Sequence, residues 1–343
     1  MMKYMLLVTA VMGLLGLGIL TPRGEEIVSQ ERPFVVRVPR DFPTIQQAID
    51  AVVEGGTVLI GPGLYKENLT ITKSVRLVGA GQERVQIQGR FEGSDSKIIS
   101  FFSRSILQIY IQDLTIGDPT FPIEQVLPPT PPIPEPSSVT GLWILFAPMQ
   151  MVLKRVTIGG LPSGMLGSSR YYDQGVALSS QIVLEEVNVV RNLIGLFLSG
   201  PLTVIRSKIE ENIAGIIMDG QLTIAQSSVS KNRFFGISLS HPSNPYGVQE
   251  FMGYIVENEF KQNGVGISLA SRGVGDWIVI GNNRFVQNER YGVVIQDPAC
   301  PIDSEPPSDK SAPIHTFGGN NEFHNNGQDL CPPDYPWPPG FRK

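Results

Sequence analysis

Cysteine, histidine and charged side chains are scarce in this 343-residue chain. Only two cysteines and three histidines occur, and Asp, Glu, Lys and Arg together make up 17% of the residues. The 32 acidic side chains outnumber the 27 basic ones, so the chain lacks the basic excess that nucleic-acid binding needs. Because 41% of the residues are hydrophobic, the low charge content favours a large buried core over a disordered chain.

The N-terminal apolar run is too short for a comfortable membrane span. Residues 1–20 contain Lys3 and then an apolar stretch below the roughly 20 residues of a spanning helix. This pattern is typical of a signal peptide, but no small-x-small cleavage site precedes Thr21, so an uncleaved N-terminal anchor is the alternative. We expect an extracellular, cell-surface or periplasmic protein that meets a membrane only through this segment, if it is not cleaved. Residues 21–37 are expected to be a linker.

The two cysteines, Cys300 and Cys331, both lie near the C-terminus. In an oxidising compartment, two cysteines in one region most simply form a disulfide. The alternative is a thiolate pair that binds a metal together with His315 or His324, but the spacing matches no common zinc pattern. The sequence therefore predicts a disulfide, no metal site and no cofactor.

One phrase is repeated from residue 182 onward. It consists of an apolar residue, two further residues and Asn, followed three or four positions later by Gly-apolar-x-apolar. The last copy is degraded after its Asn. The six asparagines are Asn192, Asn212, Asn232, Asn263, Asn288 and Asn326. Their shortest spacing is 20 residues, which holds two or three short strands with turns and is too short for a helical repeat.

Apolar residues alternate with period two in each copy, as in a strand. Coils of this kind predict an all-β parallel β-helix, a solenoid filled by inward side chains, over residues 57–327. We expect the asparagines to form a hydrogen-bonded ladder at one corner, in left-handed turn geometry, and the glycines to occupy a second tight corner or a positive φ.

The ends of such a solenoid need caps. Residues 38–56 are expected to close the N-terminal end with a helix that begins after Thr44, in a capping box with Gln47, and ends at Gly55-Gly56. The proline-rich residues 328–343 are expected to close the other end together with the disulfide.

Residues 38–81, VPRDFPTIQQAIDAVVEGGTVLIGPGLYKENLTITKSVRLVGAG, resemble the opening of right-handed β-helix proteins of the pectin-lyase-like superfamily. Two groups are the most similar, the pectin methylesterases and the NosD-type periplasmic or surface repeat proteins. The resemblance implies a single-stranded right-handed parallel β-helix. It does not imply one activity, since the superfamily includes lyases, hydrolases, esterases, tail spikes and proteins with no known reaction.

The resemblance to pectin methylesterases extends to residues 173–178, which would make Gln174 an oxyanion-stabilising donor. The downstream Gln-Asp pair and Asp-Phe-Ile-Phe-Gly strand, which carry the two catalytic aspartates, have no counterpart in this chain. The motifs of polygalacturonases are absent as well, whereas a calcium-dependent lyase site is harder to exclude. No catalytic residue can be assigned.

Candidate binding residues lie in two sets of insertions. Residues 118–140 and 160–174 are expected to leave the coils at one corner, and residues 240–252, 270–276 and 296–318 at another edge. Loops on one edge of a rigid solenoid suit ligand binding, and aromatics beside charged groups suit sugars. The candidates are Arg170, Tyr171, Tyr172, Asp173, Gln174, His241, Tyr246, Phe251, Arg272, Asp276 and Trp277.

These features predict an exported, non-catalytic β-helix that binds a polysaccharide or another cell-envelope component. A polysaccharide lyase or carbohydrate esterase is the alternative, and the NosD-type resemblance suggests a third, an accessory role in metal-cofactor maturation. A flat aromatic strip without paired carboxylates would favour binding over catalysis.

Overall fold

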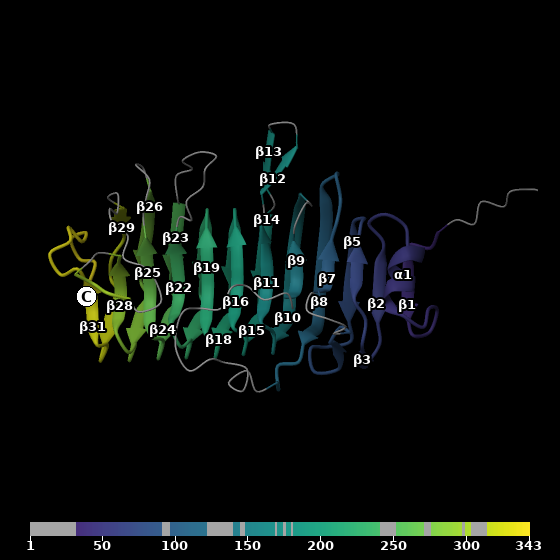
Figure 1. The fold of residues 1–343 in the computed structure, drawn as a ribbon, viewed down its shortest axis with the longest axis horizontal. Helices are drawn as coiled ribbons and strands as arrows, with labels where there is room; N and C mark the ends of the chain where they lie inside the picture. The colour runs from purple at the N-terminus through teal and green to yellow at the C-terminus, as the bar shows by residue number, and fades with distance from the viewer. Residues whose placement is uncertain are drawn as a thin grey trace, which may run out of the picture. The chain divides into compact units, whose positions relative to one another are not determined.

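The computed structural model describes residues 32–90, 97–121, 140–144, 148–168, 170–173, 176–179, 181–240, 252–270, 276–296, 299–302 and 314–343. Residues Arg32–Lys343 form one compact unit. Among the described residues, the regular elements are β-strands and a single helix, α1 (Ile45–Ala51) (Figure 1). No helix in this part of the chain is long and apolar enough to cross a membrane. The all-β prediction is thus confirmed.

Each coil contributes strands to three stacks in which neighbouring strands pair in parallel, as in a β-helix. The first stack contains β1 (Val35–Val38), β2 (Thr57–Ile60), β5 (Val75–Gly79), the first halves of β8 (Leu107–Gly117) and β10 (Met149–Gly159), β14 (Gln181–Glu185), β17 (Leu202–Ile205), β20 (Leu222–Ala225), β23 (Met252–Val256), β26 (Trp277–Gly281) and β29 (His315–Phe317).

The second stack contains β3 (Gly63–Tyr65), β6 (Val85–Ile87), the second halves of β8 and β10, β15 (Asn188–Val190), β18 (Lys208–Glu210), β21 (Ser228–Ser230), β24 (Glu259–Lys261), β27 (Arg284–Val286) and β30 (Glu322–His324). The third stack contains β4 (Leu69–Ile71), β7 (Lys97–Phe101), β9 (Thr140–Ile144), β11 (Ser163–Ser168), β16 (Ile194–Ser199), β19 (Ala214–Asp219), β22 (Phe235–Ser240), β25 (Val265–Ala270), β28 (Tyr291–Ile295) and β31 (Gln328–Cys331).

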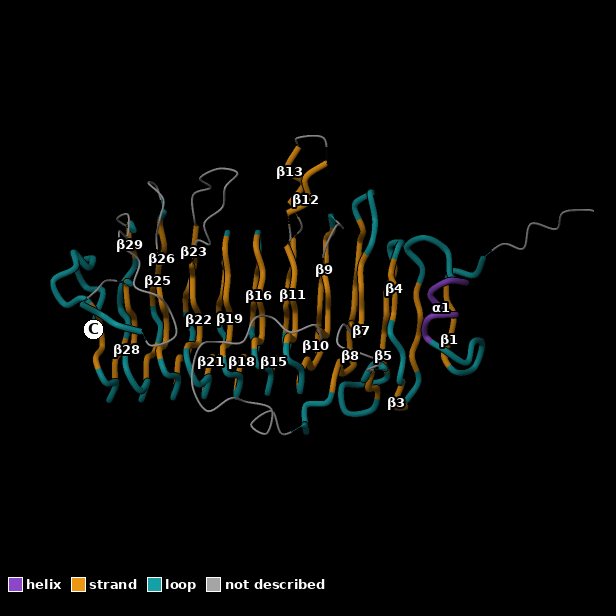
Figure 2. Tube along the Cα trace, viewed as in Figure 1, coloured by secondary structure: helices purple, strands orange, loops and turns teal. Residues whose placement is uncertain are grey.

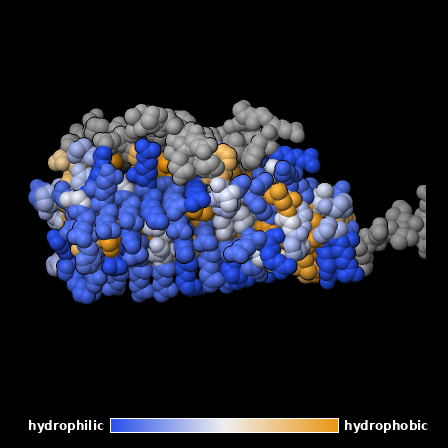
Figure 3. Space-filling model, turned by 90° about the horizontal axis from the view of Figure 1, so that it is seen from below, coloured by the Kyte–Doolittle hydropathy of each residue, from blue (hydrophilic) through white to orange (hydrophobic). Residues whose placement is uncertain are grey.

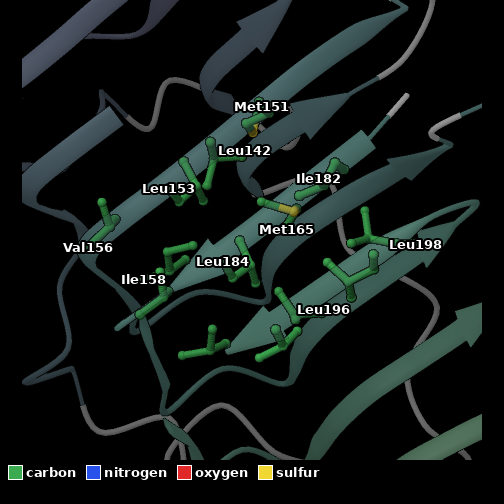
Figure 4. Close-up of a cluster of buried hydrophobic side chains, with 14 of the residues drawn as sticks. Leu142, Met151, Leu153, Val156, Ile158, Met165, Ile182, Leu184, Leu196 and Leu198 are labelled. Atoms are coloured by element: carbon green, nitrogen blue, oxygen red, sulfur yellow. The ribbon is translucent and has the colours of Figure 1, made fainter. Parts of the chain in front are cut away.

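Alternation along the strands fills the interior. In β17, Leu202 and Val204 are buried, whereas Thr203 and Ile205 are half-buried on the outer side. The inward residues of all three stacks form one core that extends from Val36 to Phe341. Figure 4 shows part of it, with leucine, isoleucine and methionine side chains of successive coils in contact. Larger rings stack in the later coils, since the centroids of Phe260 and Phe285 are 4.9 Å apart with planes inclined by 10°.

The asparagines stack in a ladder at the corner between the second and third stacks, as the repeat predicts. The Asn212 side chain donates to the Asn232 Oδ1 at 3.0 Å and to the backbone oxygen of Val189 at 3.0 Å, and the backbone N–H of Asn212 donates to the same Asn232 Oδ1. These bonds satisfy amide groups that the coil buries completely. The ladder continues in the same way from Asn192 through Asn326.

The left-handed conformation, however, is not at the asparagines or at the glycines of the repeat. It belongs to the residue before each asparagine, such as Glu211 and Lys231 with φ of 56° and 55°. The glycines lie in third-stack strands without a positive φ, and they are needed because coils approach closely there. A Cβ on Gly215 would lie 2.3 Å from the backbone oxygen of Gly236. The prediction that the glycines occupy a tight corner or a positive φ was therefore wrong, because close packing between coils is what requires them.

A second ladder, absent from the sequence prediction, lies at the corner between the first and second stacks. Its members are Ser207, Ser227, Asn258, Asn283 and Asn321. Each again follows a residue with positive φ, for example Glu257 at 58° before Asn258. Each also precedes a member of the first ladder by five residues, which is the regular signal by which the sequence could have shown it.

Both ends are closed by residues of the same unit. Ile45, Ala48 and Ile49 of α1 cover the first coil, and the Thr44 hydroxyl accepts from the backbone N–H of Gln47 at 3.2 Å. The helix ends at Ala51, before Gly55-Gly56, because Val52 is extended. Strand β1 begins at Val35, so the linker expected over residues 21–37 overlaps the first strand.

At the C-terminal end the strands continue to Cys331, beyond the expected limit at residue 327. Tyr335, Trp337 and Phe341 then pack against the core, and the backbone oxygen of Phe341 accepts from Asn321. Cys300 and Cys331 form the predicted disulfide, which ties the segment after β28 to the last coil.

Candidate functional site

One of the two predicted sets of insertions is placed differently by the structure. Strand β11 pairs with β9 and β16, so this strand, and not residues 175–178, completes its coil. Residues Arg170–Asp173 (β12) and Val176–Ser179 (β13) form an antiparallel hairpin inserted after β11. The prediction that residues 160–174 leave the coil at the same corner as residues 118–140 was wrong. Residues 164–166 also fit the Gly-apolar-x pattern of the repeat, and they lie in the third-stack strand of this coil.

The hairpin therefore leaves the coil where a third-stack strand returns to the first stack. Strands β22, β25 and β28 end at this same corner, and the second set of predicted insertions follows them (Figure 2). Of the predicted binding residues, Gln174, His241, Tyr246, Phe251 and Arg272 lie outside the described residues. Arg170, Tyr171, Tyr172 and Asp173 lie on β12, which the structure describes through its backbone pairing.

Asp276 and Trp277 are the two predicted residues whose side-chain environment is described. Asp276 is 2% exposed, and its backbone oxygen accepts from the N–H of His315 at 2.9 Å. Trp277 begins β26 and packs edge-to-face on Tyr254, with ring centroids 5.2 Å apart and planes at 87°. Asp276 thus belongs to the wall of the coil, whereas Trp277 stands on the outer face of the first stack.

Trp277 is part of an outward cluster on three neighbouring first-stack strands, β23, β26 and β29. The register places Met252, Trp277 and His315 in one row and Tyr254, Val279 and Phe317 in the next. We call these six residues the aromatic strip. The inward positions between them are filled by core residues such as Ile255 and Ile278, so the alternation of the strands holds the strip outward.

The aromatic strip is accessible. Tyr254 is 45% exposed and Phe317 is 52% exposed, which is unusual for side chains of this size on a packed sheet. Adjacent strands are spaced by about 4.8 Å, so the backbone positions of Tyr254 and Phe317, two strands apart, are separated by about 10 Å. Sequence reasoning found Trp277 but missed Tyr254 and Phe317, because only the strand register shows that they share a row.

Along the first stack, the described neighbours of the strip in the Tyr254 row are uncharged. Thr223 is the register partner of Tyr254, and Thr203 is the partner of Thr223, so half-buried threonines extend the Tyr254 row toward the N-terminus. None of the six strip residues is acidic. The strip therefore offers aromatic faces beside hydroxyl groups. The outer faces of its three strands, β23, β26 and β29, carry no carboxylate.

Charged groups lie instead at the corners, where they pair with one another between coils. The carboxylate of Asp113 accepts from both Nε and a terminal nitrogen of Arg155, at 2.6 and 2.8 Å. Glu211 lies between Arg191 and Lys231, at 3.0 and 3.3 Å. Because positive partners donate to them, the pKa values of Asp113 and Glu211 lie below their ordinary values, with the hydrogen bond from the arginine as the largest cause.

The pKa is also lowered in the other described carboxyl groups whose pKa clearly departs from its ordinary value. The pKa of Glu185 is lowered mainly by Lys154, and that of Glu322 mainly by Lys343. A general acid needs the opposite, a raised pKa near the working pH. Within the described residues, no cluster of three or more His, Cys, Asp or Glu side chains could hold a metal ion.

Comparison with known proteins agrees with the architecture. A family described as "Right handed beta helix region" matches residues 170–303. No curated protein matches the sequence. Among solved structures, the Dettilon tailspike protein is 12% identical with a TM-score of 0.52, over 85% of this chain and 62% of that one.

Two further structures are similar over most of their length. Pectin methylesterase PemA from Erwinia chrysanthemi is 15% identical with a TM-score of 0.41, over 86% of this chain and 80% of that one. The periplasmic alginate epimerase AlgG is 14% identical with a TM-score of 0.43, over 88% and 81%. At such identities the likeness concerns the fold.

Proposed function

We propose that this chain, a right-handed parallel β-helix with the pectin-lyase-like fold, is an exported protein that binds a polysaccharide or another carbohydrate of the cell envelope on its aromatic strip. The observation that carries the proposal is the exposure of Tyr254 and Phe317 beside Trp277 on one face of three adjacent strands. A rigid sheet presents these rings in fixed positions, so little conformational entropy is lost when a ligand covers them.

Sugars fit the exposed aromatic rings and polar neighbours of the strip better than purely apolar or charged ligands do. The faces of aromatic rings pack against the apolar faces of sugar rings, and polar neighbours can take the hydroxyl groups. Thr223 beside Tyr254 and His315 beside Trp277 provide such neighbours. The absence of acidic residues among the strip's six members favours binding without glycoside hydrolysis, which uses paired carboxylates.

The exported location is supported by two features. The disulfide between Cys300 and Cys331 belongs to an oxidising compartment. The apolar segment within residues 1–20 is of the kind that directs export.

The test is a binding measurement on the whole chain with a panel of neutral and acidic polysaccharides, by affinity electrophoresis and calorimetry. Trp277→Ala and Phe317→Ala should each lower the affinity for the bound polysaccharide by about tenfold or more, as for a central aromatic contact. Phe197→Ala is the matched control, since Phe197 is 37% exposed but lies on the third stack. It should bind like the unaltered protein.

The alternative enzymatic function is tested on the same panel. Reducing ends, unsaturated products and released ester groups are measured after long incubation. Binding that survives loss of Trp277 and Phe317, or turnover without dependence on them, would contradict the proposal. Absence of both binding and turnover across the panel would contradict the carbohydrate function altogether.

A further inference from the structure

The N-terminal end of the β-helix carries a second exposed surface, which the carbohydrate function does not use. It consists of Arg32, Phe34, Val35, Arg37 and Arg40, and we call it the N-terminal surface. Phe34 is 62% exposed, the largest value among the large hydrophobic residues that the structure describes, and Val35 is 41% exposed. The three arginines are exposed as well. In Figure 3, hydrophobic residues are visible over the N-terminal coils, and others lie along the rest of the face seen from below.

The fold fixes these side chains without needing them in its core. Val36 and Val38 of β1 point inward and are buried, so Val35 and Arg37 point outward. The backbone oxygen of Phe34 accepts from the N–H of Thr57 at 2.8 Å, which fixes the position at which the exposed ring leaves the chain. The ring is therefore presented on a rigid edge.

Residues 32–41 carry a net charge of +2 on a chain whose net charge is −5. Residues 32–41 contain three arginines and one acidic residue, Asp41. Its carboxylate accepts from the backbone N–H of Arg37 at 2.8 Å and lies 3.8 Å from Arg40, whose side chain remains 77% exposed. An aromatic ring flanked by arginines matches an anionic lipid surface, where rings sit at headgroup level and arginines bind phosphates.

The preceding sequence fits the same partner. The apolar segment that ends at residue 20 is separated from Arg32 by residues 21–31. Eleven residues span at most about 40 Å when fully extended, so a lipid-inserted segment would keep the N-terminal surface within that distance of the bilayer.

We propose that the N-terminal surface binds the surface of a bilayer that contains anionic lipids. Phe34 enters the headgroup region, and Arg32, Arg37 and Arg40 contact lipid phosphates. Strand β23 lies eight strand steps beyond β1 in the first stack, so the aromatic strip begins about 38 Å along the solenoid from the N-terminal surface.

The experiment measures vesicle binding by a chain that starts at Thr21, so that the apolar segment cannot insert. Residues 32–343 form a compact unit with a cap at each end, and this chain retains all of them. Vesicles of phosphatidylcholine with phosphatidylglycerol are compared with vesicles of phosphatidylcholine alone, by co-sedimentation at low and high salt. We expect binding to the anionic vesicles that weakens with salt.

Variants assign the binding to the surface. Arg37→Gln with Arg40→Gln should weaken binding by roughly 30-fold, because each arginine near an anionic surface contributes close to a fivefold factor. Phe34→Ser should weaken it further. Lys208→Gln and Phe197→Ser, a basic and an aromatic residue exposed on other faces, are the matched controls and should bind unchanged. No binding to anionic vesicles, or equal binding by the surface variants, would overturn the proposal.

Discussion

At the scale of single residues, the buried asparagines of the described coils use every polar atom of their side chains in hydrogen bonds. Asn232 is fully buried, and its amide donates to the backbone oxygen of Ile209 and to Asn263, both at 2.9 Å. Its oxygen accepts from the backbone and the side chain of Asn212. Every polar atom of the group is used, so removing this side chain takes the partner from the backbone N–H of Asn212 and from the backbone oxygen of Ile209, both on the preceding coil.

Asn232→Ala should therefore lower the free energy of unfolding by about 3 kcal/mol, since buried groups that lose their partners cost about 1–3 kcal/mol each. Asn326→Ala, at the half-buried last rung, should cost less. Chemical denaturation checks both values. Equal losses at the two positions would show that the ladder does not act through burial.

The left-handed backbone of the residues before the asparagines leads to a separate prediction. Gln262 has φ of 56° and an exposed side chain. A β-branched residue is strained there, so Gln262→Val should destabilise the protein by about 1–2 kcal/mol, whereas Gln262→Asn should be neutral or stabilising. Thermal unfolding of the two variants decides this. If the Asn variant were less stable than the Val variant, the backbone strain of the corner would lie at another residue of the turn.

At the scale of elements, charges alternate along the corner between the first and second stacks. Asp113, Arg155, Glu186 and Arg206 follow one another on successive coils, each with positive φ. Arg155 binds Asp113, and Arg206 lies 3.7 Å from Glu186. Long polar side chains at left-handed positions thus become contacts between coils, which explains why glycine and asparagine do not occupy every corner.

Asp113→Asn keeps a residue that tolerates positive φ but removes the charge. The pKa of Asp113 is lowered in the folded state, so its stabilisation is present above the ordinary carboxyl pKa and is lost as the pH falls through the lowered value. Because the pair is partly exposed, we expect a loss of only about 1 kcal/mol at pH 7. Unfolding curves of both proteins at pH 7 and at about pH 2 check this. The difference should be smaller at the acidic pH.

The sequence predicted elements well where a single periodicity determined them. Alternating residues located the strands of the later coils, and the recurring Asn located one corner. The insertion at residues 160–174 was placed at the wrong corner because residues 164–166 and 175–178 both fit the repeat, and only pairing with β9 and β16 decides between them. The strip was found in part, since Tyr254 and Phe317 join Trp277 only through the register of three distant strands.

At the scale of the whole molecule, the coils behave as interchangeable units. Residues 202–221 make up one coil without insertions, and Leu202 and Leu222 are register partners. Each coil contacts its two neighbours, so stability should be close to a sum of coil and interface contributions.

Deletion of residues 202–221 should therefore leave a folded protein that is shorter by one strand spacing, about 4.8 Å. The deletion brings Arg191 next to Lys231, so it is combined with Lys231→Glu, which restores the alternation that Glu211 provided. Small-angle scattering and cooperative thermal unfolding check the result. Deletion of residues 202–211, half a coil, is the control and should abolish folding, because it shifts every later strand to another stack.

The contact between Arg37 and Asp41 affects whether another strand can pair with the outer edge of β1. The backbone N–H of Arg37 donates to the Asp41 carboxylate, and its oxygen accepts from the N–H of Asp41. Strand β1 pairs on one side with β2, so its outer edge is where a foreign strand would add. At Arg37 both hydrogen-bonding groups of that edge are already used within the chain. A fold that could in principle extend indefinitely as a fibre thus ends here with α1 over the first coil and with the edge groups of Arg37 bonded to Asp41.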